Sequence, residues 1–286
     1  MSTTRFRPRA KRLLILSTGA SSMTPVIEQK LRMAFVDYLV IDFDPKQDFE
    51  KLVTETARVV VAGGDGTVEF IVRKLADSRH PVGILSLGAF NNFASALGLP
   101  ADLERAIEVA QKGLPRPITL GRVNGRVFLE ACAIGLLGET IALGESAKDR
   151  KFGTLGQDLR NVISARPFRY ELAGDIEGNG TAMSLVFSNT SAIGIKLPIA
   201  NSTPVNPYLE FSVLAGRTRT DLVGRALASA LLMKHKEDGA ASVFKFKRLE
   251  VKTRPRVRVY ADNYMVGRTP ATITAEVSAL KVLLPE

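Results

Sequence analysis

A glycine-rich motif, Gly63-Gly64-Asp65-Gly66-Thr67, directly follows the apolar residues 59–62. Glycine permits unusual backbone dihedral angles and close approach, so main-chain N–H groups can point at phosphate oxygens, aided by a helix N-terminus. A carboxylate beside phosphate is repulsive unless it binds Mg²⁺ or accepts a proton from an attacking hydroxyl group. The motif therefore predicts a phosphate-binding loop that uses Asp65. The competing interpretation is a tight turn in which Asp65 or Thr67 is only a helix N-cap.

A second glycine turn follows the apolar residues 82–85 and contains Gly88, Asn91 and Asn92. If both apolar runs are parallel strands, their carboxyl ends lie at the same edge of a sheet, and the two turns flank one ligand. The competing interpretation is a strand-end turn in which Asn91 or Asn92 caps the next helix.

The elements that must position these loops alternate between short apolar runs and amphipathic stretches. Strands are expected at residues 12–16, 37–41, 58–62 and 82–85, and helices begin near residues 24, 68 and 91. This alternation predicts an α/β fold with a mainly parallel sheet covered by helices on both faces. A nucleotide-binding domain is therefore expected over residues 1–117, ending at the Gly and Pro residues of 113–117 that follow a helix at 103–112.

Residues 118–286 predict a different, β-rich domain with antiparallel, sandwich-like strands that would bind the substrate. Asn124-Gly125 is a hairpin turn signal between two apolar runs. Further strands are expected at 168–173, 183–188, 209–214, 244–252, 257–261 and 279–284, and helices near 138–145, 156–164 and 221–234. The last strand could return to the first domain, and the active site is expected in the cleft between the domains.

The composition limits the partners of this chain. A net charge of +10 favours anionic partners such as phospholipid surfaces, nucleotides or nucleic acid. Nucleic acid is the least favoured, because aromatic residues make up 7% of the chain and are not interleaved with the basic clusters. A solvated face or a frayed tail is the competing interpretation of each cluster. The basic clusters comprise Arg5, Arg7, Arg9, Lys11 and Arg12, and Lys245, Lys247, Arg248, Lys252, Arg254, Arg256 and Arg258.

Cys132 is the sole cysteine, so no internal disulfide is expected and a cytoplasmic location suits the chain. Its apolar neighbours predict a packed core residue rather than a nucleophile. No apolar run approaches the roughly 20 residues of a spanning helix, so membrane contact is expected to be peripheral. The sequence leaves the oligomeric state open, a homodimer included.

With these motifs in place, the chain resembles the diacylglycerol kinase catalytic-domain family, which includes sphingosine kinases and bacterial soluble lipid kinases. The resemblance is carried by Gly63-Gly64-Asp65-Gly66-Thr67 and, about twenty residues later, by Gly88, Asn91, Phe93-Ala94 and Ala96-Leu97-Gly98-Leu99-Pro100. It implies transfer of the γ-phosphoryl group of ATP, with Mg²⁺, to a lipid hydroxyl group.

The resemblance also implies roles for individual residues. Gly63, Gly64, Gly66 and Thr67 would contact phosphate, and Gly88 and Asn91 would contact the nucleotide. Asp65 would be the metal-linked or general-base carboxylate. Asp262 would be a second catalytic acid, because Asp262-Asn263-Tyr264 stands where the family usually has Asp-Gly-Glu.

Several positions depart from the family pattern. Ala89, Asn92 and Tyr264 replace its usual threonine, acid and glutamate, and the first strand ends in Ser17-Thr18 rather than an Asn-Pro pair. A catalytically degenerate nucleotide- or lipid-binding relative is therefore one alternative. An NAD kinase-like enzyme is another, because NAD kinases share the Gly-Gly-Asp-Gly-Thr signature.

Overall fold

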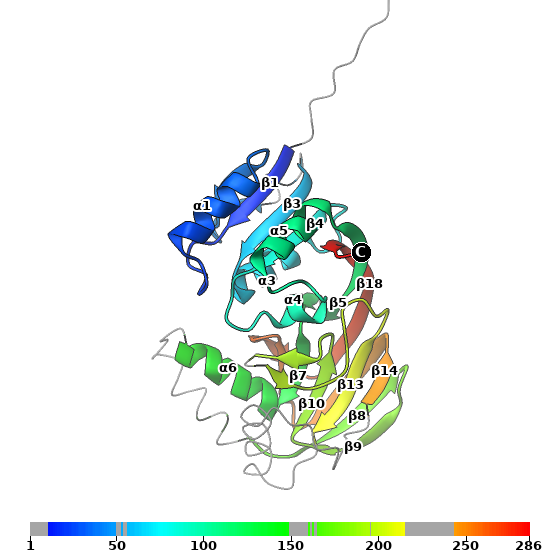
Figure 1. Cartoon of the computed structure of the whole chain (residues 1–286). Coiled ribbons are helices and arrows are strands. Elements are labelled where there is room, and N and C mark those ends of the chain that lie inside the picture. The colour runs from blue at the N-terminus through cyan, green and yellow to red at the C-terminus, as the bar shows by residue number, and fades with distance from the viewer. Residues whose placement is uncertain are drawn as a thin grey trace, which may run out of the picture. The chain divides into compact units, whose positions relative to one another are not determined.

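The computed structural model describes residues 11–49, 53, 56–148, 160, 162, 165–194, 196–214 and 243–286. The chain forms two compact units (Figure 1). The first comprises Met1–Pro117 together with Leu280–Glu286, and the second comprises Ile118–Ala279.

The first unit is built on parallel strands in the order β2-β1-β3-β4. Their bounds are β1 Lys11–Leu16, β2 Leu39–Asp42, β3 Thr56–Gly63 and β4 Pro81–Ser86. Residues 13–16 of β1 and 59–62 of β3 are almost completely buried. Such continuous apolar runs are typical of parallel strands with both faces covered. The end of β18 (Ala271–Leu284) adds to β4 in parallel, with Lys281 opposite Pro81.

Within the described residues of this unit, the helices between the strands are α1 Pro25–Ala34, α3 Asp65–Leu75, α4 Asn92–Ala96 and α5 Leu103–Lys112. Thr24 and Asp102 cap α1 and α5 by accepting hydrogen bonds from the N–H groups of Ile27 and Arg105. Helix α5 approaches β4 closely, because a Cβ atom on Gly83 would lie 3.1 Å from Ala110 Cβ.

The second unit contains a six-stranded antiparallel sheet in the order β14-β13-β10-β7-β16-β17. The strands are β7 Ala131–Gly135, β10 Ser184–Ser188, β13 Leu209–Leu214, β14 Val243–Phe246, β16 Arg258–Ala261 and β17 Tyr264–Arg268. Helix α6 (Leu136–Lys148) follows β7 and packs Leu137 and Ile141 against one face of this sheet.

The other face of that sheet packs against a second set of strands. These are β5 Leu114–Val123, β6 Arg126–Phe128, β8 Phe168–Gly174, β9 Gly178–Ala182, β15 Arg248–Arg254 and β18. Phe187 and Phe211 of the six-stranded sheet share one core with Leu249 and Ile273 of this second set. Cys132 lies in the same core and is fully buried, as its sequence context predicts.

The predicted fold class is confirmed: a parallel-rich α/β unit and an antiparallel β-rich unit. The Asn124-Gly125 turn joins β5 and β6, with φ angles of 47° and 85° that suit this residue pair. The short β11 (Ala192–Ile193) and β12 (Leu197–Pro198) were not expected. Of the expected helices, 221–234 lies outside the described residues, and 156–164 does so except for residues 160 and 162.

Residues 113–117 were expected to mark the domain boundary, and the two units divide between Pro117 and Ile118, although β5 begins at Leu114 and continues through both prolines. One predicted strand was wrong in detail. A single strand was expected at 244–252, but Lys247 separates β14 from β15, and the two strands lie in different sheets.

Candidate functional site

Three loops of the first unit emerge at the carboxyl ends of neighbouring parallel strands. Residues 17–22 follow β1, residues 63–67 connect β3 to α3, and residues 87–91 follow β4. The main chain joins them, because Ser17 N donates to Ala62 O, Ser22 N donates to Leu87 O, and Leu87 N donates to Gly63 O. Ligands of open parallel sheets bind at this edge.

The first two loops leave no room for a side chain at Gly63. A Cβ atom there would lie 2.9 Å from Thr67 Cβ and 3.0 Å from Ser17 Cβ. The Thr67 hydroxyl group donates to Ser17 Oγ at 3.1 Å. Ser17 was not among the predicted site residues, although its place directly after β1 is the signal that could have identified it.

The second and third loops meet at Asp65 and Gly88. A Cβ atom on Gly88 would lie 2.6 Å from Asp65 Oδ2 and 2.9 Å from Asp65 N. The N–H group of Phe90 also donates to Asp65 Oδ2, at 3.4 Å. The carboxylate of Asp65 therefore faces the third loop, and the two glycine turns lie next to one another.

Asn91 shapes the third loop from within. Its backbone is left-handed, with φ at 52°, and its amide group both accepts from Gly88 N and donates to Gly88 O, each at 3.0 Å. Asn91 occupies the N-cap position of α4 but makes no capping hydrogen bond with its side chain. A nucleotide contact by Asn91 stays a prediction, and its two hydrogen bonds hold the backbone of Gly88.

Helix α3 begins at the glycine motif, and no side chain caps its N-terminus. Its N-cap is Gly64, which has no side chain to cap the helix, and Asp65 is the first helical residue. The alternative in which Asp65 or Thr67 is the N-cap is therefore wrong. The first N–H groups of a helix lack partners within it, and the helix dipole favours an anion there. Gly66 is exposed, with no atom within 4 Å of an added Cβ.

Mg²⁺ is the metal that the sequence motif implies. Among the described residues, no group of three or more His, Cys, Asp or Glu side chains is placed to hold a metal ion by itself. This donor set still fits Mg²⁺, which proteins commonly bind through one or two carboxylates together with phosphate oxygens of the substrate. Asp65 is the carboxylate that these loops offer.

Asp262, the second predicted catalytic acid, lies in the β-rich unit and binds main chain. Its Oδ2 accepts from Leu129 N at 2.9 Å, and its Oδ1 accepts from Glu130 N at 2.8 Å and Ala131 N at 3.1 Å. Asp262 is 5% exposed and has a left-handed backbone, with φ at 52°. Both carboxylate oxygens are thus engaged with backbone N–H groups, an arrangement suited to positioning the segment 129–131.

Asn189 holds the same segment from its carbonyl side. The fully buried amide group of Asn189 donates to Leu129 O at 2.9 Å, and Asn189 N donates to Glu130 O at 2.8 Å. The side chain of Glu130 accepts from Gly194 N at 3.2 Å. Glu130 therefore stands on a backbone fixed from both sides, and sequence patterns gave no indication of it.

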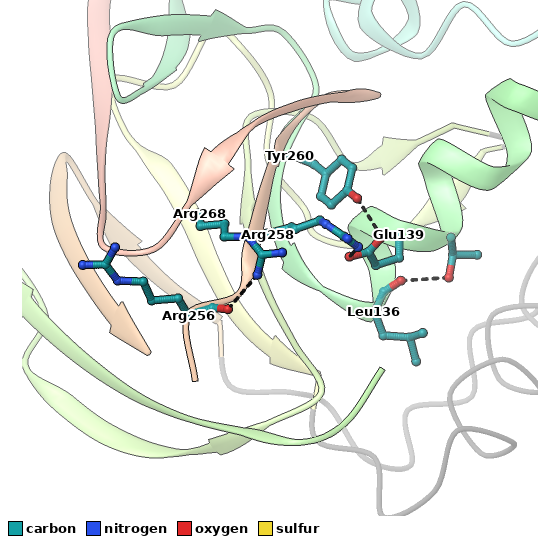
Figure 2. A network of polar contacts seen from close by, with 7 residues as sticks. Leu136, Glu139, Arg256, Arg258, Tyr260 and Arg268 are labelled. Carbon is teal, nitrogen blue, oxygen red and sulfur yellow. Dashed lines mark hydrogen bonds and ion pairs between the residues drawn. The ribbon is translucent and has the colours of Figure 1, made fainter. Parts of the chain in front are cut away.

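A buried polar network lies nearby in sequence, at the start of α6 and along β16 (Figure 2). Glu139 Oε1 accepts from Arg258 Nη1 at 3.0 Å, and Glu139 Oε2 accepts from the hydroxyl group of Tyr260 at 2.7 Å. Burial lowers the pKa of Arg258, but the hydrogen bond and charge of Glu139 outweigh it, and the pKa is raised overall. This network was missed. Its signal was an acidic residue in an otherwise apolar helix start.

Tyr264 stands where the resemblance of the sequence to the family predicts a glutamate. It is 46% exposed, and the Arg126 guanidinium lies 4.9 Å from the centre of its ring. It therefore takes part in a cation–π contact.

The thiol of Cys132 is chemically inert, because burial and the nearby charge of Asp262 raise its pKa.

Comparison with known protein families identifies the class of protein that has these features. Residues 17–123, which include all three loops, match the diacylglycerol kinase catalytic domain. The resemblance predicted from the motifs is confirmed, and with it a likeness to lipid kinases, which are phosphotransferases.

Individual relatives agree with that family. The diacylglycerol kinase of Bacillus subtilis (strain 168) is 26% identical over 245 residues, which are 83% of this chain and 80% of that protein. A crystal structure of a diacylglycerol kinase from Bacillus anthracis str. Sterne has a TM-score of 0.72 at 20% identity, covering 96% of this chain and 97% of that one.

A more distant solved structure, an NAD kinase from Archaeoglobus fulgidus in complex with ATP, has a TM-score of 0.56 at 15% identity. It covers 96% of this chain and 93% of its own. At these identities the two solved structures demonstrate the shared fold alone. None of the helices in the described ranges has the length and apolar run needed to cross a membrane.

Proposed function

We propose that this chain is an ATP-dependent lipid kinase of the diacylglycerol kinase type. It would transfer the γ-phosphoryl group to a lipid hydroxyl group at a peripheral, cytoplasmic membrane surface. The observation that carries the proposal is the meeting of two glycine loops at the helix N-terminus of α3, with Asp65 facing Gly88. The family match over residues 17–123 supports the same reaction class.

In this proposal the loops hold the phosphate groups of ATP. Main-chain N–H groups of residues 64–66 and the positive end of α3 would bind the anion, whereas Thr67 N donates to Gly64 O. Gly63 and Gly88 let the loops close on one another where side chains would collide. Mg²⁺, bound by Asp65 and phosphate oxygens, would neutralise charge during transfer.

The transfer itself asks little covalent chemistry of the protein. The new bond forms between the γ-phosphorus and the lipid oxygen as the bond to the β–γ bridging oxygen breaks, and the hydroxyl proton is released. Positioning and charge neutralisation supply most of the catalysis in such reactions. Asp262 would contribute by fixing residues 129–131, since both its oxygens accept backbone hydrogen bonds.

A second candidate function is nucleotide or lipid binding without transfer. It is favoured by Tyr264, an exposed aromatic residue under Arg126 at the position where the family usually has an acid. An NAD kinase-like reaction is the third candidate and has the NAD kinase fold similarity in its support.

One assay separates the three candidates. Radiolabelled γ-phosphate transfer from Mg²⁺-ATP is measured with diacylglycerol in mixed phospholipid vesicles and, separately, with NAD as acceptor. Label in lipid that disappears with Asp65→Asn, a change that keeps the side-chain shape, supports the lipid kinase. Label in NAD moves the assignment to the third candidate. ATP binding without transfer to either acceptor supports the second candidate and contradicts the first.

A further inference from the structure

Three phenylalanines of the first unit form an aromatic cluster: Phe43, Phe49 and Phe70. The rings of Phe43 and Phe49 are stacked, with their centroids 5.9 Å apart. Phe70 meets both of them edge to face, with its centroid 5.4 Å from that of Phe43 and 5.8 Å from that of Phe49. We refer to these three residues as the aromatic platform.

Phe43 lies at the edge of the sheet where the glycine loops emerge. It directly follows β2, and its N–H group donates to the carbonyl oxygen of Leu16, the last residue of β1, at 2.7 Å. The next residue, Ser17, accepts a hydrogen bond from Thr67 of the glycine motif. Since β2 and β1 are parallel neighbours, Phe43 borders the glycine loops on the side of β1 that faces away from β3.

Phe70 approaches the same loops along helix α3. Residues three or four apart lie on one face of a helix, so Phe70 shares a face of α3 with Gly66 and Thr67 of the glycine motif. Long side chains on a helix point back towards its N-terminus, which for α3 is the end that carries the motif. An added Cβ atom at Gly66 would meet no atom within 4 Å. The face of α3 that leads from the motif to Phe70 is therefore open where it begins.

The aromatic platform combines one buried ring with two rings that remain partly exposed to water. Phe49 is 3% exposed, whereas Phe43 and Phe70 are half-buried. The exposed residues Asp42 and Asp44 flank Phe43 in the chain. Partly exposed aromatic rings beside a glycine loop at a helix N-terminus suit a ligand that has both an anionic group and a flat ring. A purine nucleotide has both, and its base stacks on aromatic side chains through its π-face.

We propose that Phe43 and Phe70 bind the purine base of the nucleotide whose phosphate groups lie at the glycine loops, and that they accept adenine and guanine alike. The inference rests on the proposed function, because it concerns the base of the phosphoryl donor. Stacking uses the flat face that every base has, and a phenylalanine ring has no donor or acceptor that could read the edge of a base. The aromatic platform therefore sets how tightly a purine binds without setting which purine it is.

The test measures binding by isothermal titration calorimetry, with Mg²⁺ present, for the wild type and the variants Phe43→Leu and Phe70→Leu. Leucine keeps an apolar side chain and removes the ring. The ligands are ATP, GTP, CTP and inorganic tripolyphosphate, which has the phosphate chain without a base. The control is Phe244→Leu, because Phe244 is 45% exposed and contacts a neighbouring ring, that of Phe211, but belongs to the second unit.

The wild type should bind ATP and GTP within about three-fold of each other, and more tightly than CTP and tripolyphosphate, because a purine offers the larger ring system. Each leucine variant of the platform should bind ATP and GTP roughly ten-fold more weakly, while its affinity for tripolyphosphate stays unchanged. The control should match the wild type. Phe43→Tyr and Phe70→Tyr retain a ring and should bind ATP within about three-fold of the wild type.

Two results on the wild type alone would overturn the inference: tripolyphosphate that binds as tightly as ATP, or a preference for ATP over GTP of roughly a hundred-fold. Equal losses of ATP and tripolyphosphate binding in the leucine variants would overturn it as well, because the rings would then only support the loops. Unchanged ATP binding in both leucine variants has the same consequence.

The lipid kinase assay on the same proteins separates this inference from the proposed function. Transfer to lipid with an unchanged KM for ATP in both leucine variants would overturn the aromatic platform and leave the kinase standing. Ring-dependent ATP binding by a wild type that transfers no phosphate to lipid would overturn the kinase and leave the aromatic platform standing.

Discussion

Asp65 and Gly88 belong to different loops, yet a single methyl group on Gly88 would lie 2.6 Å from the Asp65 carboxylate. Ser86 and Gly63, the last residues of β4 and β3, are register partners in the parallel sheet. Asp65 and Gly88 are thus held together by the strands behind them. The proximity makes the third loop sensitive to the smallest possible substitution.

Gly88→Ala is expected to destabilise the protein by about 1–3 kcal/mol, because the added carbon forces the loops apart. The midpoint of urea unfolding measures this change. Phosphoryl transfer should fall along with it, since Asp65 moves. An alanine at this position that leaves both stability and transfer unchanged would contradict the described packing.

Unlike Gly88→Ala, the substitution Gly66→Ala should not lower the stability of the protein. There is space for its Cβ atom, and alanine in a helix is favoured over glycine by roughly 0.5–1 kcal/mol, so stability should be unchanged or increased. ATP affinity should nevertheless fall if the loop closes on phosphate, and isothermal titration calorimetry measures it. Unchanged ATP affinity in this stable variant would argue against a phosphate contact at Gly66.

Asp262→Ala and Asp262→Asn should differ strongly. Alanine removes the acceptor of three backbone N–H groups and places a non-glycine, non-polar residue at a positive φ, at a cost of roughly 3 kcal/mol or more. Asparagine tolerates this backbone conformation and keeps one acceptor oxygen, so it should cost less. If Asp262 positions residues 129–131, transfer activity should follow stability across the two variants. A stable but inactive Asp262→Asn would instead support the catalytic role predicted from the motif.

Glu139→Gln should destabilise the β-rich unit by about 1–3 kcal/mol, because it leaves the Arg258 charge partly buried without a counter-ion. Tyr260→Phe, which removes the other hydrogen bond to Glu139, completes a double-mutant cycle with it. Glu108→Gln is the control, because Glu108 forms an exposed helix pair with Lys112 and should change stability by less than about 0.5 kcal/mol. Equal effects of Glu139→Gln and Glu108→Gln would contradict a stabilising network.

The carboxylate of Asp175 should make an acid-sensitive contribution to the stability of the folded protein. The N–H groups of Lys247 and Arg248 donate to its carboxylate at 2.7 and 3.0 Å and lower the pKa of Asp175. A carboxyl group with a lowered folded-state pKa stabilises the fold above its unfolded pKa of about 3.9, and this contribution is lost as the pH falls through the folded-state pKa. The stability difference between wild type and Asp175→Asn should therefore be constant from pH 7 to 5 and shrink below pH 4, as measured by urea unfolding at each pH.

The parts of the fold that were predictable follow local rules. The helix at Leu103–Lys112 and the strand at Leu209–Leu214 have the predicted bounds. The N-cap residue Asp102 of the helix and the unbroken run of strand-favouring residues can both be recognised in the local sequence. Lys247 was not recognised as a strand break, because the hydrogen bonds that separate β14 from β15 come from the distant Asp175 and Ala275.

The candidate site divides in the same way. The glycine motif predicts the loop that it forms, because only glycine fits against Thr67 and Ser17 at position 63. The contacts of Asp262 and Glu139 with residues more than a hundred positions away have no local sequence signal. Sequence reasoning could therefore name Asp262 through the motif but could not foresee that its oxygens bind main chain.

The parallel pairing of Lys281 and Val282 with Pro81 and Val82 also affects how the protein is made. The sheet that carries the glycine loops gains this strand only after the whole β-rich unit has left the ribosome. Until then the β4 edge presents unpaired N–H and C=O groups to other chains. During synthesis the nascent first unit is thus a natural client for chaperones that shield open strand edges.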